Sequence, residues 1–130
     1  NGERTMIGYV TVGTNDLEKA AAFYDRIAEL LDTPRMMEDP GNFIAWGKPD
    51  GGAGIGLTKP FNGEPASVGN GVMVALAARD EAHVDEIYKT ALELGGTCEG
   101  EPGWRGDSFY AAYFRDLDGN KLNAFIMKMG

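Results

Sequence analysis

The chain has 130 residues, of which 43% are hydrophobic, and a formal net charge of −8 at pH 7. This length fits one domain with a real core, and the acidic balance argues against nucleic acids and anionic membranes as partners, because both bind basic surfaces. No apolar run approaches the roughly 20 residues of a membrane-spanning helix, and the single Cys98 allows no internal disulfide. We therefore expect a cytoplasmic protein in which residues 1–5 are a leader or an expression remnant.

The first half reads as a strand, a helix and three short strands. Residues 7–12 predict the strand. The helix follows from the N-cap candidates Asn15 and Asp16 to about Leu31, with apolar residues at a spacing of three or four. Short strands are then predicted at 35–37, 43–46 and 54–58.

The second half repeats this order after a segment at 59–70 that is rich in Gly, Pro and Asn. A strand is predicted at 72–77, and a helix begins at Asp80 and ends at Gly95 and Gly96. Three strands follow at 97–99, 109–115 and 121–127. The glycine-rich residues 100–106 are expected to form a loop, which either closes over a ligand or is only a long connection.

The two halves also share residues at a fixed distance. Five residue types recur 64 positions apart: Val10 and Val74, Asp16 and Asp80, Tyr24 and Tyr88, Glu29 and Glu93, Leu30 and Leu94. A period of this length indicates one supersecondary unit that has been duplicated. Function is then expected between the halves, where Tyr9 and Met73 are equivalent positions.

Each half is thus a βαβββ module, and the fold class is α+β. A βαβββ module leaves one apolar sheet face that its single helix does not cover. We therefore predict a single domain at 6–130 with two tandem modules, 6–59 and 71–128, joined by a linker at 60–70. The modules are expected to form a curved eight-stranded mixed sheet with a concave pocket.

Two motifs connect the chain to a known family. The first is Asp16-Leu17 followed by Phe23-Tyr24, and the second runs from Asp116 to Asn120 with the sequence Asp-Leu-Asp-Gly-Asn. The chain from Met6 to Met127 resembles the glyoxalase, bleomycin-resistance and extradiol-dioxygenase group, the vicinal oxygen chelate superfamily. Because members commonly pair their modules across a two-fold axis, the resemblance also implies a homodimer.

The resemblance further implies a divalent metal held by His, Glu or Gln on the first and last strands of each module. The matching positions here are Tyr9, Gly56, Met73 and Asn123. None suits Zn, Ni, Mn or Fe, which need imidazole or carboxylate donors. The single His83 is expected to be a solvent-side or capping residue at the second helix. We therefore expect a glyoxalase-like branch with no metal and no cofactor.

Strand alternation and the resemblance together predict which residues line the pocket. Tyr9 is either a hydrogen-bond donor and general acid or an aromatic residue of the pocket floor. Tyr113 is the second catalytic candidate, because the fosfomycin-resistance branch has a tyrosine at the matching position, although simple packing explains it equally well. The remaining expected pocket residues are Thr11, Trp46, Gly56, Met73, Trp104, Arg105 and Asn123.

These residues favour a domain that binds a small organic molecule in a metal-free cup. The domain would either sequester that molecule or carry out metal-independent chemistry on it. One alternative is a metal-dependent lyase or isomerase of the glyoxalase I type, or a dioxygenase-like enzyme, with atypical ligands. Another is a dimerisation or structural module that binds no small molecule.

Overall fold

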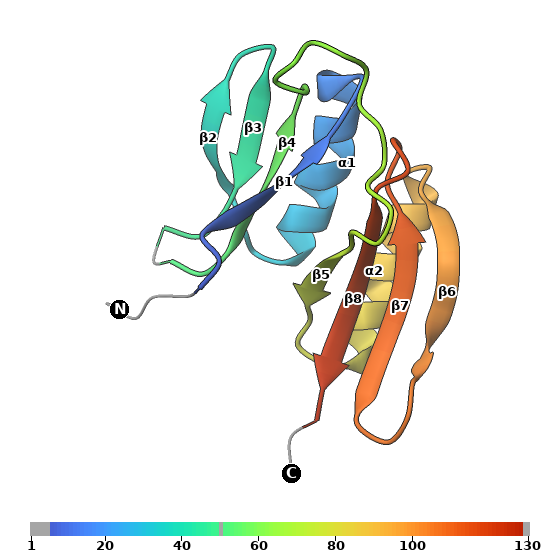
Figure 1. Cartoon of the computed structure of the whole chain (residues 1–130). Coiled ribbons are helices and arrows are strands. Elements are labelled where there is room, and N and C mark those ends of the chain that lie inside the picture. The colour runs from blue at the N-terminus through green and yellow to red at the C-terminus, as the bar shows by residue number, and fades with distance from the viewer. Residues whose placement is uncertain (1–5, 50, 129–130) are drawn as a thin grey trace. The chain divides into compact units, whose positions relative to one another are not determined.

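The computed structural model describes residues 6–49 and 51–128, and the chain divides into two compact units, Asn1–Ser67 and Val68–Gly130. The division falls inside the predicted linker. The expected leader at 1–5 lies outside the described residues. Each unit contains one helix and its own set of strands (Figure 1).

The first unit contains one helix and a four-stranded sheet. Its elements are β1 (Tyr9–Gly13), α1 (Leu17–Leu30), β2 (Arg35–Asp39), β3 (Phe43–Trp46) and β4 (Gly54–Thr58). The strand order is β1-β4-β3-β2, in which β1 and β4 are parallel and the other neighbours antiparallel.

The second unit has the same architecture. Its elements are β5 (Val74–Ala77), α2 (Glu81–Glu93), β6 (Thr97–Trp104), β7 (Phe109–Arg115) and β8 (Lys121–Met127). The strand order is β5-β8-β7-β6, again with only the first pair, β5 and β8, parallel (Figure 1).

The duplication extends to the register of the strands. Thr11 pairs with Gly56 in the first unit, and the equivalent Ala75 pairs with Asn123 in the second. The two tandem βαβββ modules and the α+β class are therefore confirmed. The eight strands occur as two four-stranded sheets, each hydrogen-bonded within its own unit.

Each helix covers one face of its own sheet with the predicted apolar stripe. In the first unit, α1 packs against β3 and β4, and Phe23, Tyr24 and Ile27 are buried. In the second unit, α2 packs against β6, β7 and β8, with Val84 and Ile87 fully buried. Neither described helix has the length and apolar character needed to cross a membrane.

Aspartates at equivalent positions begin both helices. Asp16 accepts a hydrogen bond from the backbone N–H of Lys19 at 3.1 Å, and Asp80 accepts one from His83 at 2.9 Å. Asn15, the other N-cap candidate, instead accepts a hydrogen bond from Ala66 N–H at 2.7 Å and so fastens the linker to the first unit. His83 is buried, and its Nδ1 accepts from Arg79 N–H at 3.0 Å, so the capping alternative holds and the solvent-side one is wrong.

The Asp-Leu-Asp-Gly-Asn motif forms the turn between β7 and β8. One carboxylate oxygen of Asp116 accepts from the N–H groups of Asp118 and Asn120, both at 2.9 Å. The other accepts from the amide Nδ2 of Asn120 at 2.9 Å. Gly119 has a φ of 92°, which favours glycine. The motif therefore serves the fold.

Strand β6 is longer than the sequence predicts. The glycine-rich segment expected as a loop continues the strand to Trp104, with register shifts between Cys98 and Gly100 and between Gly100 and Gly103. Glycines weaken a strand and are common at bulges, which is why the pattern indicated a loop.

A polar cluster joins β2 and β3 to α1. Both carboxylate oxygens of Asp25 on α1 accept from Arg35, at 2.9 and 2.8 Å, and the indole N–H of Trp46 donates to Asp25 at 2.9 Å. The hydrogen bonds from Arg35 are the main reason that the pKa of Asp25 lies below its ordinary value. Trp46 itself is 2% exposed.

Removing either helix cap should destabilise the protein similarly. Asp16→Ala and Asp80→Ala each remove an acceptor for an orphan N–H of the first turn, and we expect each to lower the free energy of unfolding by about 1 kcal/mol. Urea denaturation measures this. The exposed Asp107 provides the control, because Asp107→Ala should change stability by less than about 0.5 kcal/mol. Equal effects of all three variants would contradict the capping role.

The Asp25 cluster predicts a pH dependence of stability. The pKa of Asp25 is lower in the folded than in the unfolded protein. The contribution of Asp25 to the free energy of unfolding is therefore fully present above the pKa of the unfolded state and is lost as the pH falls through the pKa of the folded state. Asp25→Asn should lower stability by about 1 kcal/mol at pH 7. The difference between wild type and Asp25→Asn should shrink in acid, as measured by urea denaturation at pH 7 and pH 3. If the stability difference between wild type and Asp25→Asn is the same at both pH values, the predicted pH dependence is wrong.

Candidate functional site

Each sheet has one face packed against its helix and one that we call its helix-free face. In the first unit the register places Tyr9, Thr11, Phe43 and Gly56 on this face. Tyr9 is 57% exposed, and its ring meets that of Phe43 edge-on with centroids 6.4 Å apart. A Cβ added at Gly56 would lie 2.8 Å from Cε1 of Phe43. The space left by the missing side chain at Gly56 is therefore filled by an aromatic ring.

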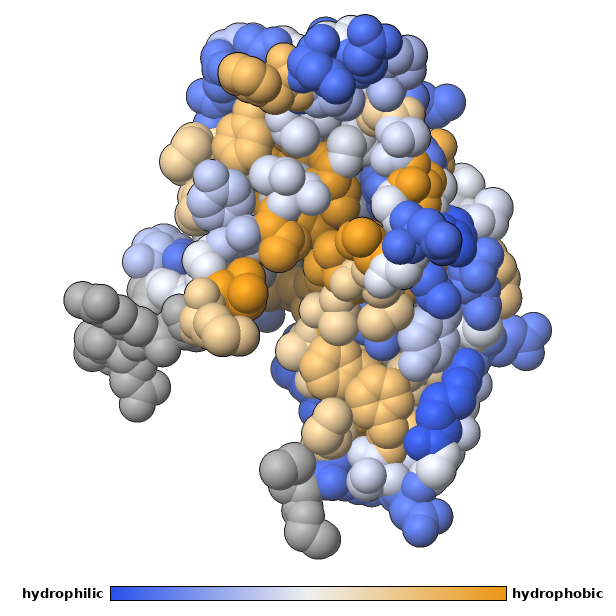
Figure 2. All heavy atoms as spheres, viewed as in Figure 1, coloured by the Kyte–Doolittle hydropathy of each residue, from blue (hydrophilic) through white to orange (hydrophobic). Residues whose placement is uncertain are grey.

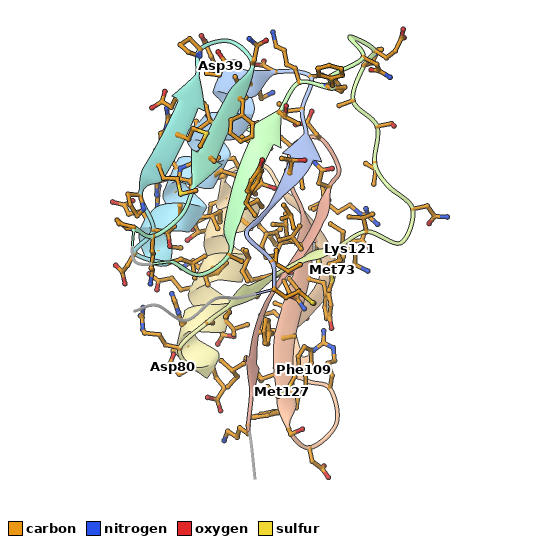
Figure 3. The ribbon with its side chains drawn as sticks, turned by 60° about the vertical axis from the view of Figure 1, so that its left-hand side comes forward. Asp39, Met73, Asp80, Phe109, Lys121 and Met127 are labelled. Atoms are coloured by element: carbon orange, nitrogen blue, oxygen red, sulfur yellow. The ribbon has the colours of Figure 1, made fainter. Side chains whose placement is uncertain are left out.

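The helix-free face of the second unit has an apolar end and a polar end. Two paired strands supply it, with Phe109, Ala111, Tyr113 and Arg115 on β7 and Met127, Phe125, Asn123 and Lys121 opposite them on β8. Phe109 and Phe125 stack with centroids 5.5 Å apart. In Figure 3, Phe109 and Met127 lie together at one end of the sheet, while Met73 and Lys121 lie together toward the other. Figure 2 shows apolar residues over the first of these ends, bordered by hydrophilic ones.

Two cations flank the ring of Tyr113 at the polar end. The guanidinium carbon of Arg105 lies 5.3 Å from the ring centroid, and Nζ of Lys121 lies 5.5 Å from it. These distances are within the range of cation–π attraction. The predicted residues Tyr113 and Arg105 are thus brought together, and Lys121 joins them.

Backbone carbonyls hold Arg105 in place. Its Nη1 donates to the carbonyls of Gly103 and Ala111 at 2.8 and 3.1 Å, and its Nη2 donates to Glu101 at 2.8 Å. A Cβ at Gly100 or Gly103 would lie 3.1 or 3.2 Å from the guanidinium nitrogens. The glycines of β6 therefore give the guanidinium room to lie against the strand.

Asn123 is the buried polar group of this face. It is 1% exposed, and its amide oxygen Oδ1 has no hydrogen-bond partner among the described residues. It pairs with Tyr113 on β7 and with Ala75 on β5. A buried acceptor without a partner costs stability, and such atoms recur at functional sites.

A cavity of about 450 Å³ adjoins the polar end. Arg115 and Lys121 line it together with Met73 and residues 68–72. Arg115 is already paired with Glu99 at 3.1 Å. The volume suits a small organic molecule. Two larger hollows in the first unit lie along α1, and Arg35, which lines both, is already bound to Asp25.

Two expected pocket residues lie elsewhere. Trp46 is on the helix side of the first sheet, where its ring packs 5.8 Å from that of Tyr24. Trp104 pairs with Tyr110, whose hydroxyl donates to Asp85 of α2. The phase of each strand decides which face a side chain occupies, and it places both tryptophans on the helix side of their sheets. The convergence of Tyr9 with Met73 and Asn123 stays a prediction, since these residues belong to different units.

Strand alternation predicts that Lys121 and Phe125 share a face with Asn123, and the register of β7 and β8 places the three on one face. The position of Phe43 over Gly56 has no such signal, because it depends on packing between strands that are not neighbours in sequence.

The positions that the family resemblance assigns to a metal do not fit one. Tyr9 offers a phenol, Met73 a thioether, Asn123 a neutral amide and Gly56 no side chain, with Phe43 in the adjoining space. Among the described residues no group of three or more His, Cys, Asp or Glu side chains is placed to hold a metal ion.

The fold and the site define a class of protein: tandem βαβββ modules whose helix-free sheet faces carry the candidate chemistry. Residues 6–124 match the Glyoxalase/Bleomycin resistance protein/Dioxygenase superfamily, and the chain belongs to this family. No protein of curated function matches the chain.

Solved structures agree with this assignment. A glyoxalase/bleomycin resistance protein from Albidiferax ferrireducens T118 is 35% identical, with a TM-score of 0.86 over 95% of this chain and 100% of that one. A glyoxalase-related enzyme from Fulvimarina pelagi is 19% identical, with a TM-score of 0.73 over 94% and 88%. A lactoylglutathione lyase from Agrobacterium tumefaciens is 22% identical, with a TM-score of 0.68 over 95% of both chains. The last two similarities show the fold alone.

Replacing the unpartnered amide should stabilise the protein. Asn123→Leu substitutes an apolar side chain of similar size, and we expect it to raise the free energy of unfolding by about 1 kcal/mol, because the buried Oδ1 then disappears. Urea denaturation is the measurement. The matched control is Asn120→Leu, which removes a hydrogen bond to Asp116 and should be destabilising. A destabilised Asn123→Leu would show that the amide serves the fold.

Proposed function

We propose that the protein binds a small organic molecule on the helix-free face of the second unit, without a metal ion. The observation that carries this proposal is the buried Oδ1 of Asn123, which has no partner among the described residues and pairs across the strands with Tyr113. A ligand that inserts between the side chains covering this atom and donates a hydrogen bond would satisfy it. The stacked Phe109 and Phe125 provide an apolar surface on the same face.

Tyr113 and Asn123 would have distinct roles in this site. The phenol of Tyr113 can both donate and accept a hydrogen bond, whereas the free Oδ1 only accepts. Sequestration needs these contacts alone. Metal-independent catalysis would in addition need Tyr113 to transfer a proton. Tyr9 and Thr11 lie on the helix-free face of the first unit, where Tyr9 is proposed to offer its phenol as a hydrogen-bond donor.

A metal-dependent lyase, isomerase or dioxygenase-like enzyme is the alternative within the family. The chemistry of Tyr9, Gly56, Met73 and Asn123 speaks against it, because none supplies the imidazole or carboxylate that such metals need. A homodimer and a purely structural module remain separate predictions, and light scattering and native mass spectrometry for retained ligand address them.

Adding Zn, Ni or Mn should leave the melting temperature within about 1 °C of its metal-free value, because a metal that the native state does not bind shifts no equilibrium. Differential scanning fluorimetry measures this, after purification without chelators and with elemental analysis. A clear rise in melting temperature, or about one metal per chain, would overturn the metal-free proposal.

A designed variant supplies the positive control for the metal test. Tyr9→His and Gly56→Glu place an imidazole and a carboxylate on one face of the first sheet. Phe43→Ala must accompany them, because the ring otherwise fills the space at Gly56. The triple variant should gain stability when Ni or Zn is added, whereas the variant that retains Phe43 should gain less.

A further inference from the structure

We infer that the ligand of the proposed site is an organic acid with an apolar body. Arg105 and Lys121 bind its acid group beside Tyr113, and Phe109 and Phe125 contact its apolar part. This inference rests on the proposed function and names the chemical class of the ligand.

The charge of the site favours an anionic ligand. Among the described residues, no carboxylate lies within ion-pair distance of Arg105 or Lys121, although the chain has 20 acidic residues and only 12 basic ones. Arg35 and Arg115, by contrast, are each paired with a glutamate or aspartate. On an acidic chain, two unneutralised cations around one phenol favour an anion as the ligand.

The hydrogen bonds of Arg105 leave two of its N–H donors for the acid group of a ligand. A guanidinium has five N–H donors, and three of them are used by the carbonyls of Glu101, Gly103 and Ala111. The Nε–H and one Nη2–H have no partner among the described residues. Two donors on adjacent nitrogens match the two oxygens of a carboxylate.

The order of polar and apolar residues along the face indicates the order of the corresponding groups in the ligand. Along β7 and β8, the two cations Arg115 and Lys121 are cross-strand neighbours at one end of the face. Phe109 and Met127 are cross-strand neighbours at the other end. Asn123 stands between these ends, with its free acceptor. A matching ligand therefore has an acid group, a hydrogen-bond donor near that group, and an apolar part beyond it.

Three small probes test each part of this ligand separately, by isothermal titration calorimetry on the full chain. The first is 3-phenyllactate, which has a carboxylate, a hydroxyl and a phenyl ring. The second is its methyl ester, which lacks the charge, and the third is 3-phenylpropanoate, which lacks the hydroxyl. We expect 3-phenyllactate to bind with a Kd of about 1 mM or below. The ester should bind about tenfold more weakly, and 3-phenylpropanoate several-fold more weakly.

Variants connect the binding to the named residues. Arg105→Gln and Lys121→Met should each weaken binding of 3-phenyllactate about tenfold and leave binding of the ester unchanged. The control is Lys89→Met, which removes the same charge from the exposed side of α2. Raising the salt concentration should weaken binding of the acid more than that of the ester, because only the acid interaction is screened.

The outcomes separate the inference from the proposed function. If the ester binds as well as the acid, or if Lys89→Met weakens the acid as much as Lys121→Met does, the inference is overturned and the proposed function stands. If none of the three probes binds, both are overturned. Melting temperatures of Arg105→Gln and Lys121→Met near that of the wild type show that a loss of binding is not a loss of fold.

Discussion

Each four-stranded sheet in this protein has two faces, and its unit supplies one helix to cover them. The apolar stripes of α1 and α2 fill one face of each sheet with a tight core. The remaining face carries residues that the core does not need, such as Tyr9 in the first unit and Tyr113 in the second. The candidate functional residues all lie on the face that the single helix of each unit leaves uncovered, because residues there are not constrained by packing against a helix.

The sequence predicted the elements well because their signals are local. Three-residue and four-residue spacing located both helices, and strand alternation alone is enough to separate Tyr113 from Tyr110, which lies on the opposite face of β7 and bonds to α2. The errors arose where the signal is not local. Trp46 and Trp104 pack against Tyr24 and Tyr110 on the helix side of their sheets and not in the expected pocket. The extension of β6 was hidden because its glycines serve the contact with Arg105 and not a turn. Contacts between strands, such as Phe43 over Gly56, leave no trace in periodicity.

The two copies of the module have diverged on their helix-free faces while keeping the same strand register. Thr11 and Gly56 in the first copy correspond to Ala75 and Asn123 in the second. The first face holds neutral aromatic residues in contact with each other, and the second holds cations and a buried amide. Duplication allows this difference, because the large core side chains, such as Phe23, Trp46, Ile87 and Phe114, lie on the helix side of each sheet.

The attachment of Arg105 to three backbone carbonyls has a consequence for the thermodynamics of recognition. A free arginine side chain loses about 2 kcal/mol of rotamer entropy when it is immobilised. Here the immobilisation has already occurred on folding, because the strand itself holds the guanidinium. Whatever binds to its remaining N–H groups meets a rigid fork, so little conformational entropy is lost at that contact and no rearrangement of the arginine needs to precede it.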